Sequence, residues 1–205
     1  MIRIALKTWM GAALLASPFL MMAASEFTPP PTAQAFKVPL GLLPIQWPKD
    51  NPYSVAKWEL GRALYYDPRL SGDGTVSCAT CHNPKMAFTD NLAVSSGIRG
   101  QKGGRSAPTV INRAYSLAQF WDGRAGTLEE QALGPMQNPI EMGHSHPGIV
   151  KTLSGVPGYR AMFKAAFGSE DFTIDHAGKR SRRLSEPCCR GTRRMTGTAP
   201  ATGRR

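Results

Sequence analysis

Alternating polar and apolar residues, the usual pattern of a β-strand with one buried face, are absent from this sequence. Beyond residue 24 it also lacks any apolar stretch long enough to cross a membrane. What it does contain is apolar residues at three- and four-residue spacing, bounded by capping residues, proline and glycine. These signals occur in residues 54–71, 127–135, 147–155 and 157–168, whereas residues 90–107 have no apolar period. We therefore predict an all-α fold with unusually long loops.

The central part of the chain lacks a strong excess of either charge. The whole chain of 205 residues has a formal net charge of +11, but residues 36–179 carry fifteen basic and twelve acidic side chains. Most of the excess comes from residues 180–205, where eight arginines stand against one acidic residue, Glu186. A nearly balanced body gives no electrostatic argument for a nucleic-acid partner. We expect none.

The N-terminal residues differ in composition from the body. Arg3 and Lys7 precede a largely apolar run from Trp9 to Ala24, and small residues that suit cleavage follow it. A basic start, an apolar stretch and small residues are typical of a secretory signal. We predict that residues 1–35 are such a signal, with its cleavage position left open. An uncleaved membrane anchor is the alternative, although the run contains a proline and is short for a span.

Only four cysteines occur in the chain, and two of them form the motif Cys78-x-x-Cys81-His82. A structural zinc would need a second ligand pair, and the adjacent Cys188 and Cys189 are poorly spaced for one. A catalytic disulfide of the thioredoxin type would lie between a strand and a helix. An ordinary disulfide would leave the histidine without a role. The motif is typical of covalent haem attachment, in which the thiols bind the vinyl groups and the histidine ligates iron. We predict haem c.

Ligands for the second axial position of the iron are scarce in the sequence. An electron-transfer cytochrome closes that position with methionine or histidine. Residues 83–120 contain no histidine, and their one methionine, Met86, lies very close to the attachment motif. The other candidates are methionines that could equally fill gaps in a core: Met136, Met142 and Met162. An open iron face would favour chemistry on a small ligand.

Three longer stretches resemble one protein family. They read CATCHNPKMAFTD, GRSAPTVINRAYSLAQFWDGRAGTLEEQALGPMQNPIEMG and PGYRAMFKAAFG. They are similar to the bacterial di-haem cytochrome c peroxidases and to their relatives that mature methylamine dehydrogenase. The resemblance runs from about Pro44 to Lys179. It implies an exported all-α protein with two cytochrome-c-like domains and one haem c in each. Residues 36–179 would form the N-terminal domain, so we expect one haem in this chain.

The resemblance also implies roles for individual residues. Cys78 and Cys81 would attach the first haem, and His82 would be its proximal ligand. Glu141 corresponds to the distal acid–base, which would accept a proton from peroxide and return it to the leaving oxygen. Gln131 corresponds to the polar residue that orients peroxide and the charge developing on it.

A tryptophan of the family lies between the two haems, and Trp121 corresponds to it. The implied activity is the reduction of hydrogen peroxide to water in the periplasm, with a small cytochrome c or a copper protein as electron donor. Two alternatives stay open: a mono-haem electron-transfer cytochrome c, and a maturation-type di-haem enzyme that oxidises a protein partner. The oligomeric state is open as well, with a homodimer among the options.

Two departures from the family pattern change these expectations. Many family peroxidases carry a histidine that caps the resting iron, in the loop that here reads SSGIRGQKGGRSAPT and contains none. We therefore predict a first haem that is open on one face without reductive activation. The family's calcium between domains often uses an asparagine where this chain has Ser106. A hydroxyl is a poorer ligand for calcium than a carbonyl oxygen, which weakens the expectation of calcium.

The resemblance stops at Lys179, and neither a second attachment motif nor the axial methionine of a second domain follows. Residues 180–205 hold hardly an apolar side chain and cannot bury a core. We interpret them as an unstructured product of a reading-frame shift. The alternative is a basic arm for a membrane surface or an acidic partner. A chain that truly ends here is expected to lack its electron entry and to be at best a weak peroxidase.

Overall fold

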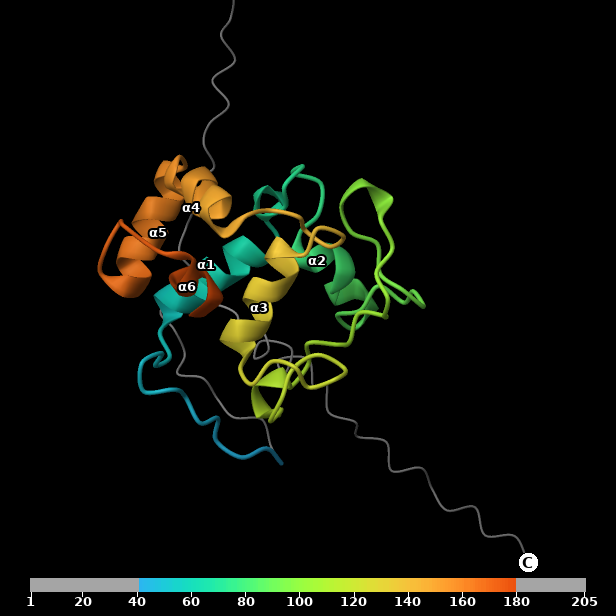
Figure 1. Cartoon of the computed structure of the whole chain (residues 1–205). Coiled ribbons are helices and arrows are strands. Elements are labelled where there is room, and N and C mark those ends of the chain that lie inside the picture. Colours follow the sequence, from blue (N-terminus) through green and yellow to red (C-terminus); the bar gives the residue numbers. More distant parts are fainter. Residues whose placement is uncertain (1–40, 180–205) are drawn as a thin grey trace, which may run out of the picture. The chain divides into compact units, whose positions relative to one another are not determined.

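The computed structural model describes residues 41–179, and all regular structure in that range is helical (Figure 1). Its α-helices are α1 (Val55–Tyr65), α2 (Cys78–Cys81), α3 (Leu128–Gln137), α4 (His146–Ser154), α5 (Pro157–Phe167) and α6 (Ile174–Lys179). Its short 3₁₀ turns are η1 (Pro68–Leu70), η2 (Pro84–Met86), η3 (Ile98–Gly100) and η4 (Arg113–Tyr115). Isolated β-bridges occur, but residues 41–179 form no strand. The predicted all-α class is confirmed.

Both ends that the sequence marks as unusual, the predicted signal of residues 1–35 and the basic tail of residues 180–205, lie outside the described residues. Within residues 41–179, no helix combines the length and the apolar character needed to cross a membrane.

Local sequence signals explain where most of the helices begin and end. Ser54 accepts a hydrogen bond from the Lys57 N–H at the start of α1, as its position before the apolar residues predicts. Helices α4 and α5 each have a proline in the first turn, where the missing N–H would have no helical partner. Gly168 ends α5 with a φ of 85°, which glycine adopts without steric penalty.

Helix α3 begins behind Thr127, as its sequence predicts, but ends later. The Thr127 hydroxyl accepts the Glu130 N–H at 3.0 Å, and the Glu130 carboxylate accepts the Gly126 N–H at 2.9 Å. The prediction that residues 134–135 close this helix is wrong, because α3 continues to Gln137 with Pro135 inside it. The last turn survives the missing N–H of the proline because Met136 is buried in the core.

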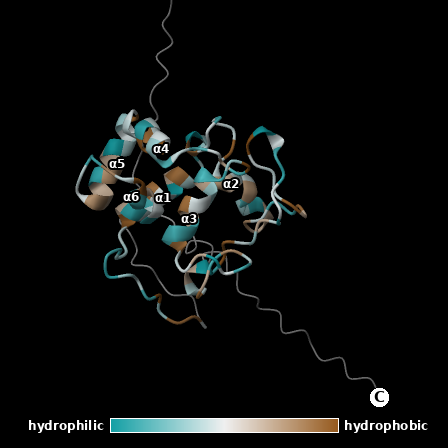
Figure 2. Ribbon diagram, in the orientation of Figure 1, coloured by the Kyte–Doolittle hydropathy of each residue, from teal (hydrophilic) through white to brown (hydrophobic). Residues whose placement is uncertain are grey.

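The core lies among α1, α4 and α5. Helix α1 packs against α5, and α3 packs against α6. Side chains four residues apart, Leu60 and Leu64 on α1 and Ile149 and Leu153 on α4, are fully buried with Phe163 of α5. Figure 2 shows hydrophilic and hydrophobic residues alternating around these helices, as amphipathic packing requires. This core fixes one end of α3, and the other face of α3 is free to line the cavity described below.

A buried polar cluster ties the segment before α1 to α3 and α6. The Asn51 side chain donates to Glu129 Oε1 at 2.9 Å and to the Lys179 carbonyl at 2.8 Å, and it accepts from Lys57 Nζ at 3.3 Å. Asn51→Ala should lower the free energy of unfolding by about 1–3 kcal/mol, because Lys57, Glu129 and the Lys179 carbonyl each lose one hydrogen bond in this cluster. Urea unfolding of the haem-loaded protein measures this loss. The exposed Gln137→Ala is the control, and an equal loss in both variants would contradict the prediction.

Candidate functional site

Residues from four parts of the chain surround a cavity of about 480 Å³ between α2, the loops around residues 95–124, and α3. This volume lies in the range of cofactor sites. All seven residues predicted from the sequence line the cavity: Cys78, Cys81, His82, Ser106, Trp121, Gln131 and Glu141. The tertiary structure thus brings together side chains that are up to 63 positions apart, from Cys78 to Glu141.

The attachment motif is a single helical turn. Ser77 and Thr80 cap it, with the Ser77 N–H donating to Thr80 Oγ1 at 3.0 Å. Cys78 and Cys81 lie three residues apart and therefore share one face of α2, and neither forms a disulfide. Burial, aided by nearby carboxylates, raises the pKa of Cys81 to about 11. A catalytic disulfide would need a thiol with a lowered pKa, so this surrounding fits thioether attachment better.

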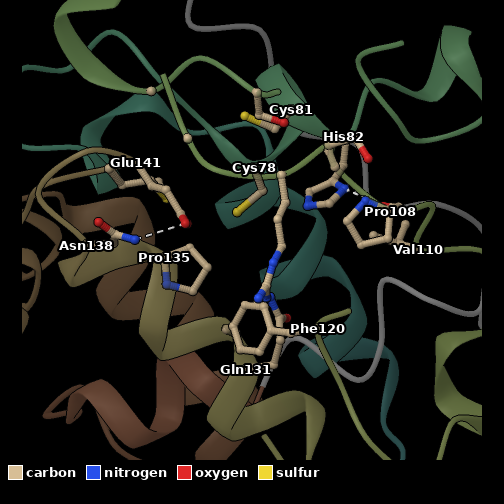
Figure 3. Close-up of a pocket in the computed structure, with 18 of the residues that line it drawn as sticks. Cys78, Cys81, His82, Pro108, Val110, Phe120, Gln131, Pro135, Asn138 and Glu141 are labelled. Atoms are coloured by element: carbon tan, nitrogen blue, oxygen red, sulfur yellow. Dashed lines mark hydrogen bonds between the residues drawn. The ribbon is translucent and has the colours of Figure 1, made fainter. Parts of the chain in front are cut away.

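His82 is oriented by two backbone carbonyls. Its Nδ1 lies 3.0 Å from the Pro108 oxygen (Figure 3) and 3.3 Å from the Phe88 oxygen. Both partners are acceptors, so Nδ1 must carry the proton, and Nε2 keeps its lone pair for a metal. Burial lowers the pKa of His82, which keeps the ring neutral as iron ligation requires. The Tyr65 hydroxyl donates to the carbonyl of His82 and fixes its backbone.

The loop that follows His82 is held in a strained conformation. Ala87 and Phe88 have φ values of 52° and 61°, in the left-handed region that residues with a Cβ avoid. Hydrogen bonds from the Phe88 N–H to Asn83 O at 2.8 Å and from the Asn83 N–H to Thr89 O at 3.0 Å close the loop. Such residues cost about 1–3 kcal/mol each and cluster at functional sites. Here the strain places the Phe88 carbonyl against the imidazole.

Glu141 lies across the cavity from His82, in the turn after α3. Figure 3 shows the Glu141 carboxylate and the His82 ring on either side of Cys78. The Asn138 side chain builds this turn: its Nδ2 donates to Glu141 Oε1 at 3.0 Å, and its Oδ1 accepts the Ile140 N–H at 3.1 Å. Burial raises the pKa of Glu141, and the Arg124 charge and the Asn138 amide oppose part of that rise.

The loop of residues 95–109, which contains no histidine, packs directly on the turn that holds Glu141. The Ile98 N–H donates to the Glu141 carbonyl at 2.8 Å. A Cβ on Gly97 would lie 2.0 Å from the Ile140 oxygen, so only glycine allows the two backbones to approach this closely. The loop that would carry the iron-capping histidine of the family therefore supports the backbone of Glu141 here.

Three further residues line the cavity: Gln131, Trp121 and Arg124. Gln131 projects from α3 into the cavity lining. Trp121 is 64% exposed and donates from Nε1 to the Ser106 carbonyl at 2.9 Å, so it lies at the rim of the cavity and not in the core. The Arg124 guanidinium lies 3.5 Å from the Phe120 ring centroid and pairs with Asp122 at 2.9 Å.

Of the candidate axial methionines, only Met142 lines the cavity, and its side chain is 4% exposed and belongs to the core. Outside the attachment motif, the described histidines do not line it: His144, His146 and His176. The His146 Nε2 lies 3.1 Å from the Leu133 carbonyl. Residues 41–179 also hold no group of three His, Cys, Asp or Glu side chains suited to a bare metal ion, while calcium through Ser106 stays a prediction.

The residues of the cavity fit a covalently attached haem. Two thiols share one helical face, a neutral imidazole has a free Nε2, and the lining includes apolar side chains such as Val76, Val110 and Leu128. Sequence reasoning missed Asn138, Arg124 and the two carbonyls that bind His82. The Asn138-Pro139 pair is a turn signal and could have drawn attention to the asparagine, whereas nothing local marks the carbonyls.

Comparisons with known proteins point to one family. The family model described as di-haem cytochrome c peroxidase matches residues 55–180. The cytochrome c551 peroxidase of Nitrosomonas europaea is 51% identical over 125 residues, which cover 61% of this chain and 37% of that protein. The methylamine utilization protein MauG of Methylorubrum extorquens is 48% identical over 127 residues, 62% of this chain and 36% of that protein.

A solved structure has a similar fold. A MauG-like protein associated with microbial copper homeostasis has a TM-score of 0.67 and 38% identity, over 75% of this chain and 47% of that one. The chain thus spans little more than a third of the length of the curated relatives named above.

Proposed function

Because the chain belongs to the di-haem cytochrome c peroxidase family, we propose that its cavity holds one haem c. We propose further that the protein reduces hydrogen peroxide to water with electrons from a small redox protein. The observation that carries this proposal is the Glu141 carboxylate, which faces the His82 imidazole across the cavity. An acid–base group on that side is what a peroxidase needs and an electron carrier does not.

Each residue of the cavity has a part in this reaction. Cys78 and Cys81 would hold the haem through thioethers, and His82 would ligate its iron through Nε2. When bound, the haem supplies a redox-active iron that can pass electrons to peroxide. Glu141 takes a proton from one oxygen of the peroxide and delivers it to the other. With two electrons and two further protons, both oxygens leave as water.

The neighbours of Glu141 keep it ready for that transfer. Asn138 holds Oε1, which leaves the other carboxylate oxygen available to peroxide. Gln131, on the same wall, can donate a hydrogen bond to the oxygen on which negative charge develops. Arg124 contributes a positive charge that favours the ionised form of Glu141.

Two measurements test the proposal. The haem content per polypeptide of protein purified from the native gene with its downstream sequence should be at least one. Peroxide consumption with reduced cytochrome c should depend on that haem. A haem-loaded protein that shows a six-coordinate low-spin ferric spectrum and no reaction with peroxide would identify an electron carrier instead.

The reaction with peroxide should weaken at acid pH. Glu141 must be a carboxylate to accept a proton, and burial raises its pKa, so the rate should fall as the pH drops through a value above that of an ordinary glutamate. Asn138→Leu removes a donor that favours the charged form, so its acid limb should move to higher pH. Stopped-flow rate constants measured against pH give the two profiles. If the parent protein and Asn138→Leu lose rate at the same pH, Glu141 is not the group that must be ionised.

A second candidate is a maturation-type enzyme that oxidises a protein partner. It is favoured by the nearly equal identities to a peroxidase and to MauG, 51% and 48%, and by the exposed Trp121 at the cavity rim. Turnover of peroxide with reduced cytochrome c distinguishes the peroxidase from it.

We also propose that the protein acts in the periplasm. The basic start and apolar run of residues 1–24 support export. Haem staining of periplasmic and cytoplasmic fractions tests this, and a haem protein confined to the cytoplasm would contradict it.

A further inference from the structure

A second hollow adjoins the cavity on the side of Glu141. It is a groove of about 320 Å³, bounded by residues 120–125, by the face of α3 from Glu130 to Pro135, and by the turn from Asn138 to Glu141. Phe120, Arg124, Pro135, Asn138 and Glu141 line both the groove and the cavity. The two spaces therefore meet at the carboxylate that the mechanism uses.

His82 does not line the groove, and neither do Phe88 and Pro108, whose carbonyls bind its ring. Cys78 and Cys81 would hold a haem beside α2, and neither cysteine lines the groove. The groove would then stay open between Glu141 and solvent.

The side chains at the groove suit a small neutral molecule. The lining holds two carboxylates, Glu130 and Glu141, against the one guanidinium of Arg124, which already pairs with Asp122, so the groove disfavours anions. Both side chains are held in place: Glu130 Oε2 accepts the Gly126 N–H at 2.9 Å, and Arg124 pairs with Asp122. The polar groups at the opening are therefore held in place and can form hydrogen bonds with hydrogen peroxide.

We propose that this groove is the path by which hydrogen peroxide reaches Glu141. The proposal rests on the proposed function, and it adds a place of entry and a class of molecule that can pass: small, uncharged and able to form hydrogen bonds. Larger or anionic oxidants would be held back at the opening between α3 and residues 120–125.

Gly134 offers a direct test, because it is exposed on α3 and lines the groove. A Cβ there would lie 3.6 Å from Phe120 Cζ, an ordinary contact, so Gly134→Ala should fit and serves as the matched control. Gly134→Leu adds a side chain that would fill the groove, and leucine favours the helix more than glycine does. Gly134→Met is a more flexible second blocker in case the leucine variant does not fold.

The probe is cyanide, which binds ferric haem as a small ligand and enters as neutral hydrogen cyanide. Stopped-flow mixing with the haem-loaded protein gives its association and dissociation rate constants. Blocking a path slows entry and exit alike, so both constants should fall about tenfold in the leucine and methionine variants relative to alanine, with the Kd within about twofold.

Two results would overturn the proposal. Equal rate constants in all three proteins would mean that ligands enter elsewhere, and a change in Kd without matched changes in both rates would mean a distorted site. Failure of the proposed function looks different, because the protein would then lack haem or bind cyanide normally without reacting with peroxide.

Discussion

Replacing both Cys78 and Cys81 with alanine should abolish covalent haem attachment. The two thiols are the sulfur atoms that α2 presents on one face to the cavity, and no other described residue supplies a thiol. A cavity of about 480 Å³ would then hold no anchored cofactor, so we also expect a large loss of stability. Haem staining after denaturing electrophoresis and thermal unfolding measure the two effects.

Thr80→Ser is the matched control for this experiment, since it lies between the cysteines and keeps the hydroxyl that caps α2. It should retain the haem. If the double alanine variant still carried haem through denaturation, attachment by this motif would be disproved. Single cysteine variants should keep one thioether, and the pyridine haemochrome spectrum distinguishes them from the parent protein.

Glu141→Gln should slow the reaction with peroxide by about 10²- to 10⁴-fold, the usual contribution of a general acid–base group. Glutamine keeps the size of the side chain and can still accept the hydrogen bond from Asn138, so the turn should persist. What it loses is the ability to take up a proton. Haem content and the ferric spectrum should therefore stay close to those of the parent protein.

The bimolecular rate constant for peroxide, measured by stopped flow, is the quantity to compare. Glu170→Gln is a suitable control, because it removes an exposed carboxylate that pairs with Lys164 and does not line the cavity. An unchanged rate in Glu141→Gln with full haem content would remove the acid–base role from this residue.

The same residue also illustrates the limits of reading a sequence. Without the family resemblance, Glu141 is a carboxylate in a polar turn and nothing local marks it as catalytic. Its position opposite His82 depends on α3 ending at Gln137, two residues beyond the predicted end. It depends equally on the close approach of Gly97 to Ile140, a contact between segments 43 positions apart. Such contacts follow from packing and leave no local pattern.

The sequence by itself determined the chemistry of attachment and most of the helices. Two cysteines and a histidine at fixed spacing make the haem motif. Ser54 and Gly168 mark helix ends through hydrogen bonds to near neighbours, and Pro147 and Pro157 mark helix starts because their missing N–H has no helical partner there. Both kinds of signal depend on residues close together in the sequence, so they can be recognised without knowing the fold.

The tertiary structure alone decided the rest. It placed the Pro108 carbonyl on His82, brought Glu141 and Cys78 to one cavity, and opened the groove between α3 and residues 120–125. It also kept α3 helical past Pro135, since burying Met136 outweighs one lost hydrogen bond. These features arise where distant segments meet, and their free energy comes from burial and packing, which no short stretch of sequence encodes.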